Sequence, residues 1–148
     1  MKLFKGLDES LAVEDAAAAL GYLRALPECA GKVAAIGFCL GGKLAYLMAA
    51  RTDVDASVSY YGIGIDKALN EAAAIRKPLL LHVAERDRLC PPEAQRAINQ
   101  GLAPYSRLVT THVYTGVGHA FARIGGAEYD AGAARLAQER TLEFLSNL

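Results

Sequence analysis

Short apolar runs alternate along the chain with longer stretches rich in alanine, leucine and charged residues. The apolar runs predict strands, because several are β-branched or aromatic and most end next to glycine or a polar residue. They cover residues 32–36, 55–61, 78–83 and 107–114. The stretches between them contain good helix formers and predict helices over residues 11–26, 43–51, 66–75, 93–102 and 129–145.

Strands separated by helices predict parallel strands joined by right-handed crossovers. We therefore expect an α/β fold, with a parallel sheet that is covered by helices on both faces. No internal repeat, low-complexity tract or linker divides the sequence, which indicates a single domain over residues 1–148. In such sheets the active crevice lies beyond the carboxyl ends of the strands, so chemistry is expected in the loops after residues 36, 61, 83 and 114.

The composition supports a folded protein and limits its partners. Hydrophobic residues make up 53% of the 148 residues and charged residues 22%, which is enough apolar surface for a core and excludes general disorder. Sixteen Lys and Arg balance sixteen Asp and Glu, so the chain lacks the basic excess of a nucleic-acid-binding protein. Small molecules and other proteins remain as partners.

The sequence also indicates where the protein works. The amino end reaches Asp8 before an apolar run long enough for a signal peptide develops. The uncharged apolar stretch over residues 33–42 stops at Lys43, well short of the roughly 18 residues that span a bilayer. Cys29, Cys39 and Cys90 have neither CxxC spacing nor a histidine at zinc-ligand spacing. We expect a cytoplasmic protein with no membrane segment and no metal.

The loop after the first strand contains a pattern for covalent catalysis. Residues 37–42 read GFCLGG, in which Gly37 and Gly41 stand two positions before and after Cys39. This G-x-C-x-G arrangement is a nucleophile elbow with sulfur in place of the serine oxygen. Glycines are needed because side chains beside the nucleophile would collide in the tight turn. The N-terminal end of the following helix favours a thiolate, and the N–H of Leu40 becomes one oxyanion donor.

The sequence of this loop has two other interpretations. A cysteine in an apolar segment is usually a small core residue, but the flanking glycines argue against that here. Residues 37–43 also fit G-x-x-x-x-G-K, the start of a phosphate-binding loop. Such a loop needs Ser or Thr at position 44 to reach magnesium, and this chain has Leu44, which cannot coordinate a hard cation. Nucleotide binding is therefore only a third hypothesis.

A cysteine nucleophile needs a base and a group that orients the base. His82 and His112 lie within predicted strands, whereas His119 follows the fourth strand in a glycine-rich loop. Asp87 follows the third strand, with Glu85 as the local alternative. The order of nucleophile, acid and histidine matches an α/β-hydrolase triad, in which each member follows its own strand. In this arrangement Asp87 fixes the tautomer of His119, which presents its other nitrogen to the thiol.

Five segments of the chain together carry a family resemblance. They are GFCLGG at residues 37–42, YYG at 60–62, the loop that contains Asp87, GHAFAR at 118–123 and ERTLEFL at 139–145. They resemble the dienelactone hydrolase (carboxymethylenebutenolidase) family of the α/β-hydrolase superfamily, and the likeness runs over nearly the whole chain. A cysteine elbow combined with the His-x-Phe-Ala-Arg block is more specific than a general hydrolase pattern.

The resemblance implies roles for several residues. Cys39, Asp87 and His119 match the family triad, Arg123 matches an arginine that binds the substrate carboxylate, and Tyr60 matches a tyrosine of the cleft. The implied reaction is hydrolysis of dienelactone to maleylacetate in the breakdown of (chloro)aromatic compounds, by a monomer without a cofactor. A thiolate suits this substrate, because an enol-type leaving group departs without strong acid catalysis and leaves an acyl-thioester.

The resemblance also implies that this chain corresponds to the C-terminal portion of the family domain. The family places several strands and helices before the helix expected at residue 11. In the family, those earlier elements also supply a glutamate that modulates the cysteine, a second substrate-binding arginine and the second oxyanion N–H. The strand at residues 33–36 would then present an apolar edge, through which we expect self-association or pairing with another chain. An inactive fragment that pairs in this way is the alternative to an active hydrolase.

Overall fold

A four-stranded parallel sheet forms the centre of the computed structural model, which describes residues 6–29 and 31–148. The strands lie side by side in the order β1-β2-β3-β4, which is also their order in the sequence. They are β1 (Ala34–Phe38), β2 (Ala56–Tyr60), β3 (Leu79–Ala84) and β4 (Val109–Tyr114). The parallel sheet expected from the sequence is confirmed.

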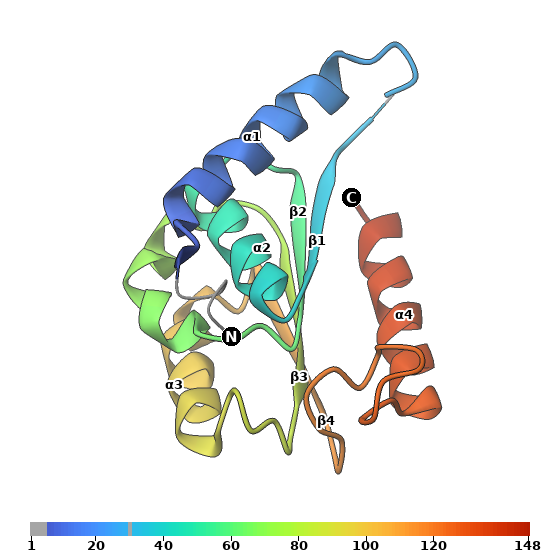
Figure 1. The fold of residues 1–148 in the computed structure, drawn as a ribbon. Coiled ribbons are helices and arrows are strands. Elements are labelled where there is room, and N and C mark those ends of the chain that lie inside the picture. Colours follow the sequence, from blue (N-terminus) through green and yellow to red (C-terminus); the bar gives the residue numbers. More distant parts are fainter. Residues whose placement is uncertain (1–5, 30) are drawn as a thin grey trace.

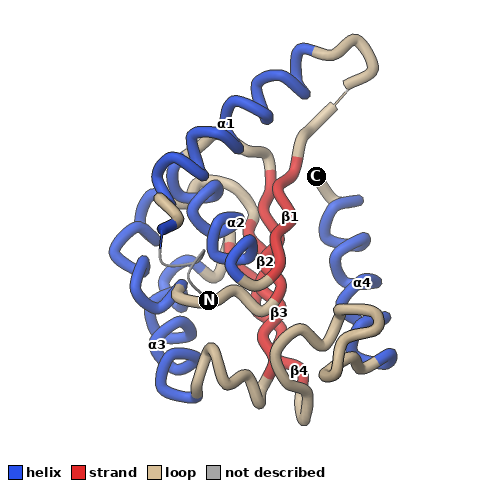
Figure 2. The backbone as a smooth tube through the Cα atoms, viewed as in Figure 1, coloured by secondary structure: helices blue, strands red, loops and turns tan. Residues whose placement is uncertain are grey.

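Helices cover both faces of this sheet (Figures 1 and 2). One face carries α1 (Glu9–Ala25), α2 (Leu40–Arg51), η2 (Ile65–Ala74) and α3 (Pro92–Leu102), and the other carries α4 (Ala131–Ser146). A short turn, η3 (Ala103–Tyr105), leads from α3 towards β4. Helix α2 packs directly on β1 and β2, while α1 packs on α2. None of the helices in the described part of the chain is both long and apolar enough to cross a bilayer.

The alternation of side chains along each strand divides the interior into two apolar layers. In β3, Leu79 and Leu81 face the layer under α1, α2 and α3, whereas Leu80 faces the layer under α4. The first layer also contains Tyr46 and Leu47 of α2, both fully buried. Burial of β3 on both faces explains why it reads as a nearly continuous apolar run.

One helix boundary is corrected, and one helix is specified further. Helix α2 begins at Leu40 rather than at residue 43, because Gly41 and Gly42 lie within its first turn. The helix expected over residues 66–75 is present as η2, and it is wound as a 3-10 helix. Its buried residues, Ile65, Ala68 and Ala72, have a spacing that fits either winding, so the pattern alone does not separate the two.

Strand β1 presents an apolar edge, as the family resemblance implied for residues 33–36. Ile36 and Phe38 are 47% and 51% exposed. These side chains are exposed because β1 is the outermost strand of the described sheet. Only one of its edges is paired, and that edge pairs with β2.

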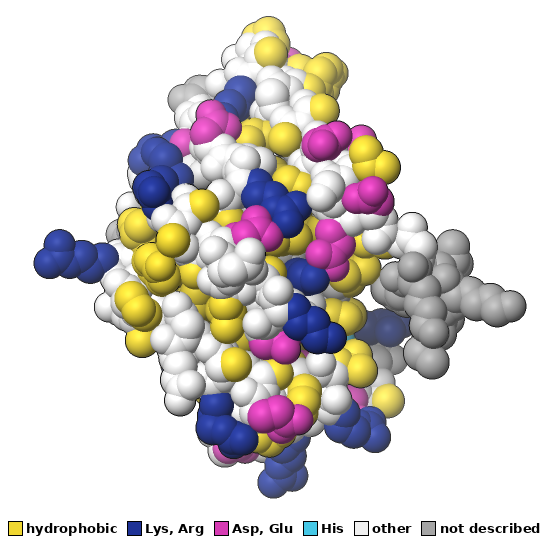
Figure 3. Space-filling model, turned by 90° about the vertical axis from the view of Figure 1, so that its left-hand side faces the viewer, with side chains coloured by type: hydrophobic (Ala, Val, Ile, Leu, Met, Phe, Trp, Pro, Cys, Tyr) yellow, Lys and Arg dark blue, Asp and Glu magenta, His cyan; other side chains and the backbone are white. Residues whose placement is uncertain are grey.

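The surface carries charges of both signs. On the face shown in Figure 3, Lys and Arg side chains are interspersed with Asp and Glu. Several make ion pairs between elements, including Arg51 with Glu71 and Lys43 with Glu9. This mixture agrees with the zero formal net charge of the sequence.

Candidate active site

The turn from β1 into α2 is closed by glycines at two positions where the backbone packs on itself. A Cβ atom on Gly37 would collide with the carbonyl group of Gly41. A Cβ atom on Gly42 would lie 2.8 Å from the Tyr60 carbonyl oxygen and 2.8 Å from the Gly62 Cα. Side chains are therefore excluded at Gly37 and Gly42 by fixed backbone atoms. The collision expected at Gly41 is wrong, because nothing lies within 4 Å of its Cβ position, and Gly42 is the second glycine that the elbow requires.

Cys39 lies at the apex of this elbow in a strained backbone conformation. Its φ is 58° and its ψ is −119°, a region that L-residues other than glycine rarely adopt. The N–H of Cys39 donates to the Tyr60 carbonyl at 3.0 Å, so the residue still pairs with β2 just before α2 begins. The side chain is partly exposed, and the thiol is free.

Leu40 is the first residue of α2, where backbone N–H groups have no acceptor within the helix. Its N–H is adjacent to the thiol and belongs to the positive end of the helix dipole. This is the position from which a backbone donor can stabilise negative charge that develops on a carbonyl oxygen attacked by Cys39.

Asp87 is held rigidly in the loop after β3. Its side chain is only 1% exposed, and Oδ1 accepts hydrogen bonds from the N–H groups of Leu89 at 2.8 Å and Cys90 at 3.3 Å. These two bonds fix the plane of the carboxylate. Its second oxygen, Oδ2, therefore points in a defined direction.

That direction is towards His119, in the loop after β4. The distance from His119 Nδ1 to Asp87 Oδ2 is 2.8 Å, which is hydrogen-bond length. Since an ionised carboxylate can only accept, Nδ1 carries the proton and Nε2 is left as an acceptor. The structure thus brings together two of the residues that the sequence singled out, one as orienting acid and one as base.

Tyr61 joins this cluster and was missed by sequence reasoning. Its ring lies edge-on to the His119 imidazole, with centroids 5.2 Å apart and planes at 65°. The pKa of Tyr61 is raised to about 12, mainly by burial and to a smaller extent by Cys39, while Arg123 acts to lower it. The effects of Cys39 and Arg123 place both residues within electrostatic reach of the Tyr61 hydroxyl. The strand register carries a signal that could have identified Tyr61. Phe38 of β1 pairs with Tyr60 of β2, so Cys39 and Tyr61, which directly follow them, leave the sheet side by side.

Cys39 and His119 both lie near Tyr61, but they are not hydrogen-bonded to each other. Among the described residues, the Cys39 sulfur has no hydrogen-bond partner. No hydrogen bond therefore joins Cys39 to His119 in this structure. Such contacts often tighten only when substrate is bound.

Tyr60 is the last residue of β2, and its side chain points towards α4. It is 5% exposed, its hydroxyl donates to the Ala137 carbonyl at 3.1 Å and lies 2.7 Å from Thr141 Oγ1, and its ring stacks on Phe38 at 4.7 Å. The tyrosine in contact with His119 is thus Tyr61, one residue after the tyrosine expected in the cleft. The physical reason is the backbone, because Tyr61 lies just beyond the end of β2 with a φ of 38°, which turns its ring to His119 while it still meets the Tyr60 ring edge-on at 6.1 Å.

Tyr60 belongs to a buried polar chain that fastens α4 to the sheet. His82 Nε2 lies 2.9 Å from Thr141 Oγ1, and His82 Nδ1 lies 2.8 Å from the Tyr114 hydroxyl. The Tyr60 hydroxyl uses its proton on the Ala137 carbonyl, so Thr141 must donate to Tyr60. Thr141 Oγ1 then accepts from His82 Nε2–H. This leaves His82 Nδ1 to accept from the Tyr114 hydroxyl. This order requires a neutral His82. Burial, with His112 and Arg140 nearby, lowers the pKa of His82 from 6.5 to about 3.

Arg123 lies in the loop between β4 and α4 and is exposed. The Arg123 N–H donates to the Ala120 carbonyl at 2.8 Å, and the Arg123 carbonyl accepts from the Gly126 N–H at 2.9 Å. These turns hold its backbone, while its guanidinium makes no ion pair with any described residue. A guanidinium with no ion-pair partner can bind an anionic substrate group.

The alternatives raised by the sequence have other roles. Glu85 Oε2 accepts a hydrogen bond from the Gly116 N–H at 2.7 Å and links two loops instead of contacting His119. The Lys43 ammonium is paired with Glu9 at 2.6 Å and is therefore engaged rather than free for a phosphate. Within residues 6–29 and 31–148, no three His, Cys, Asp or Glu side chains are grouped so that they could hold a metal ion.

An apolar groove of about 420 Å³ runs beside β1 on the α4 face. Ile36 and Phe38 form one wall, Leu142 and Leu145 of α4 form the other, and Ile124 closes one end. Ile124 and Leu142 are also highly exposed, so the groove continues as apolar surface.

The chain matches the model of the dienelactone hydrolase family over residues 1–148. Carboxymethylenebutenolidase of Pseudomonas putida is 40% identical over 147 residues, which cover 99% of this chain and 62% of that relative. Carboxymethylenebutenolidase 1 of Cupriavidus pinatubonensis is 38% identical over 148 residues, or 100% of this chain and 62% of the relative. The chain therefore spans less than two thirds of the length of these curated relatives.

Solved structures agree with the fold. The dienelactone hydrolase-like promiscuous phosphotriesterase P91 from metagenomic libraries has a TM-score of 0.84 and 26% identity, over 100% of this chain and 65% of that chain. Thermogutta terrifontis esterase 2 phosphorylated by paraoxon has a TM-score of 0.74 over 96% of this chain and 65% of that chain, and at 20% identity it supports the fold alone. The likeness extends from the sheet to the helices on both of its faces.

Proposed function

The chain belongs to the dienelactone hydrolase family, and we propose that it hydrolyses small carboxylated lactones or esters of the dienelactone (carboxymethylenebutenolide) type. Cys39 is the nucleophile, His119 the base and Asp87 the acid that orients the base. The observation that carries the proposal is the 2.8 Å hydrogen bond between His119 Nδ1 and the buried Asp87 carboxylate. It lies at the same edge of the sheet as the strained elbow of Cys39.

The first step opens the lactone. His119 Nε2 takes the proton of the Cys39 thiol, and the sulfur attacks the carbonyl carbon. The Leu40 N–H donates to the oxyanion that forms. When this tetrahedral intermediate collapses, the ring C–O bond breaks and the oxygen leaves as an enolate, which His119 can protonate. Cys39 then carries an acyl-thioester, and the former leaving group stays tethered to it.

The second step releases the product. His119 Nε2 takes a proton from a water molecule, whose oxygen attacks the thioester carbonyl. The C–S bond breaks, the carboxylic acid leaves and the Cys39 thiolate recovers a proton from the imidazolium. Asp87 stays ionised throughout and stabilises the imidazolium in both steps.

Substrate binding is assigned to residues around this cluster. Arg123 binds the substrate carboxylate through its guanidinium, which has no ion-pair partner among the described residues. Tyr61 forms one wall of the site beside His119, because its ring contacts the imidazole. Tyr60 contributes through the side of its ring that lines the apolar groove, since its hydroxyl is engaged with Ala137 and Thr141.

Replacement of Cys39 tests the proposed chemistry. Cys39→Ala should abolish turnover of an enol-lactone, while the far-ultraviolet circular dichroism spectrum stays that of the unmodified chain. Mass spectrometry after rapid acid quench should detect an acyl adduct on the unmodified chain and none on the variant. Turnover by Cys39→Ala at the rate of the unmodified chain would reject the proposal.

Association through the β1 edge is a second candidate function. The observation that favours it is the exposure of Ile36 at 47% and Phe38 at 51% on the outermost strand of the described sheet. An outermost strand has unpaired backbone N–H and C=O groups along one side. A second copy of the chain could add its own β1 there and bury the apolar groove of both copies.

Size-exclusion chromatography with light scattering separates the two candidates. Association predicts a stoichiometric dimer without turnover, and Ile36→Lys should convert it to monomer. Leu11→Lys, a change at a 57% exposed residue of α1 on the other face, is the matched control and should leave the dimer unchanged. A monodisperse monomer that turns over the lactone would exclude this second candidate.

A further inference from the structure

Two buried serines on β2 have hydroxyl groups without a hydrogen bond. Ser57 is 0% exposed and Ser59 is 1% exposed, and neither Oγ atom meets a hydrogen-bond partner among the described residues. An unsatisfied hydroxyl inside a protein is costly, so each of these groups requires a physical account.

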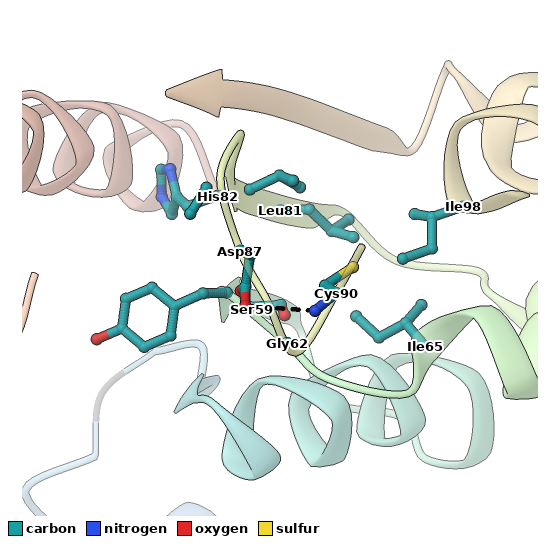
Figure 4. Close-up of a pocket in the computed structure, with 11 residues that line it drawn as sticks. Ser59, Gly62, Ile65, Leu81, His82, Asp87, Cys90 and Ile98 are labelled. Carbon is teal, nitrogen blue, oxygen red and sulfur yellow. Dashed lines mark hydrogen bonds between the residues drawn. The ribbon is translucent and has the colours of Figure 1, made fainter. Parts of the chain in front are cut away.

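Ser59 differs from Ser57 because it lines a cavity. The cavity lies where the loop after β3 passes over β2, and it is lined by Ser59, Asp87 and Cys90 together with apolar side chains from β3, η2 and α3 (Figure 4). The centre of a water molecule can occupy about 10 Å³ of it. That is close to the smallest space that holds one water molecule, and too little for a larger ligand.

The Asp87 carboxylate brings a second polar group to this cavity. Its Oδ1 already accepts two backbone hydrogen bonds, one of which, from the Cys90 N–H, is drawn in Figure 4. Its Oδ2 accepts one hydrogen bond from His119. A carboxylate oxygen can accept two, so Oδ2 keeps one acceptor position. Cys90 adds no charge, because burial raises the pKa of its thiol to about 11.

The Ser59 hydroxyl is also confined by the backbone around it. A Cβ atom built on Gly42 would lie 2.9 Å from Ser59 Oγ, and one built on Gly62 would lie 2.5 Å from it. The two glycines therefore pack directly against the hydroxyl and restrict where its proton can point. Neither glycine provides a side-chain acceptor for that proton.

We propose that this cavity binds one ordered water molecule that accepts a hydrogen bond from the Ser59 hydroxyl and donates one to Asp87 Oδ2. The water satisfies a buried hydroxyl and occupies the remaining acceptor position of the carboxylate. It connects Ser59 of β2 to the Asp87 carboxylate, which in turn holds His119. Ser59 is thus a positioning residue, and this last role rests on the proposed function of Asp87 and His119.

The site is tested by comparing Ser59→Ala with Ser57→Ala in the full chain. Both variants remove a buried, unsatisfied hydroxyl from the same face of the same strand, but only Ser59 lines the cavity. High-resolution crystal structures should contain the water in the unmodified chain and in Ser57→Ala, and should lack it in Ser59→Ala. A dry cavity in the unmodified chain would overturn the proposal, even if neither variant folded.

A second measurement tests the link to Asp87 without any need for turnover. The downfield proton signal of His119 Nδ1–H reports on its hydrogen bond to Asp87. We expect this signal to shift in Ser59→Ala and to stay in place in Ser57→Ala. An unchanged signal in Ser59→Ala, or a water retained in that variant's cavity, would refute the role of Ser59. Neither result depends on whether the chain hydrolyses a lactone.

Discussion

His119 and Asp87 are joined by a 2.8 Å hydrogen bond, although they are 32 positions apart and follow different strands. Parallel neighbours β3 and β4 bring the two loops to the same edge of the sheet. The carboxylate is almost fully buried and the imidazole is 18% exposed, so the pair is shielded from water on the aspartate side and accessible on the histidine side. A general base needs this arrangement, in which its orienting carboxylate is buried and its own ring can be reached by substrate.

Asp87→Asn should reduce kcat for an enol-lactone by roughly 10²- to 10⁴-fold, because an amide can hold His119 in the wrong tautomer. Steady-state kinetics measure the change. Glu85→Gln is the matched control and should stay within a few-fold of the unmodified chain, since Glu85 contacts the Gly116 N–H and not the imidazole. Equal losses in the two variants would contradict the assignment of the acid.

Arg123→Gln should raise KM for a carboxylated lactone by roughly 10- to 100-fold, the effect of losing one hydrogen bond between charged groups. kcat should change little, because the guanidinium is assigned to binding. A neutral lactone without the carboxylate serves as the control, and its KM should be the same for both proteins. A similar rise in KM for the neutral lactone would show that Arg123 shapes the site instead of binding the anion.

Gly42→Ala should lower the free energy of unfolding by about 1–3 kcal/mol, as overpacking in a tight interior does. The added Cβ would meet two backbone atoms at 2.8 Å, and neither can move without shifting β2 or its following loop. Gly41→Ala is the control, because nothing lies within 4 Å of its Cβ position, and there alanine should stabilise α2 by up to about 1 kcal/mol. Urea denaturation followed by circular dichroism measures both changes.

His82 predicts a loss of stability in acid. Its pKa falls from 6.5 to about 3 on folding, so between these values the unfolded chain binds more protons than the folded one. The free energy of unfolding contributed by His82 is therefore complete above pH 6.5. It declines by up to roughly 1 kcal/mol per pH unit as the pH falls towards 3.

Urea unfolding of the unmodified chain and of His82→Gln between pH 7 and pH 4 tests this dependence. Glutamine does not titrate, so the curve of stability against pH should be flatter for the variant. In the unmodified chain, the nuclear magnetic resonance signals of the His82 ring should not titrate above about pH 4. A titration of that ring between pH 6 and pH 7 would contradict the neutral hydrogen-bonded chain from Tyr114 to Tyr60.

The sequence was sufficient to predict the sheet and most of the helices, because buried parallel strands leave apolar runs between helix-forming stretches. It also led to Asp87 and His119, which the fold brings into contact. Local patterns do not record which strand lies at an edge, so the exposed apolar edge of β1 was expected from the family resemblance and not from the pattern itself. They also do not separate 3-10 from α winding over a segment as short as η2.

The tyrosine beside His119 shows a further limit of local patterns. Tyr60 and Tyr61 are adjacent, but β2 ends at Tyr60 and Tyr61 has a φ of 38°, so only Tyr61 contacts His119. The register of the strands places Phe38, Tyr60, His82 and His112 in one row across the sheet. Motif matching selects a residue type at a position, whereas the direction of its side chain depends on strands that are distant in the sequence.

The positive φ of Cys39 lowers the stability of the fold at the residue that carries the proposed nucleophilic thiol. Holding a residue other than glycine at φ 58° costs about 1–3 kcal/mol, and glycine would relieve that strain while removing the thiol. Under the proposed function, a single substitution to glycine therefore gives a more stable but inactive protein. In a lineage released from selection for catalysis, residue 39 is where we expect cysteine to give way first.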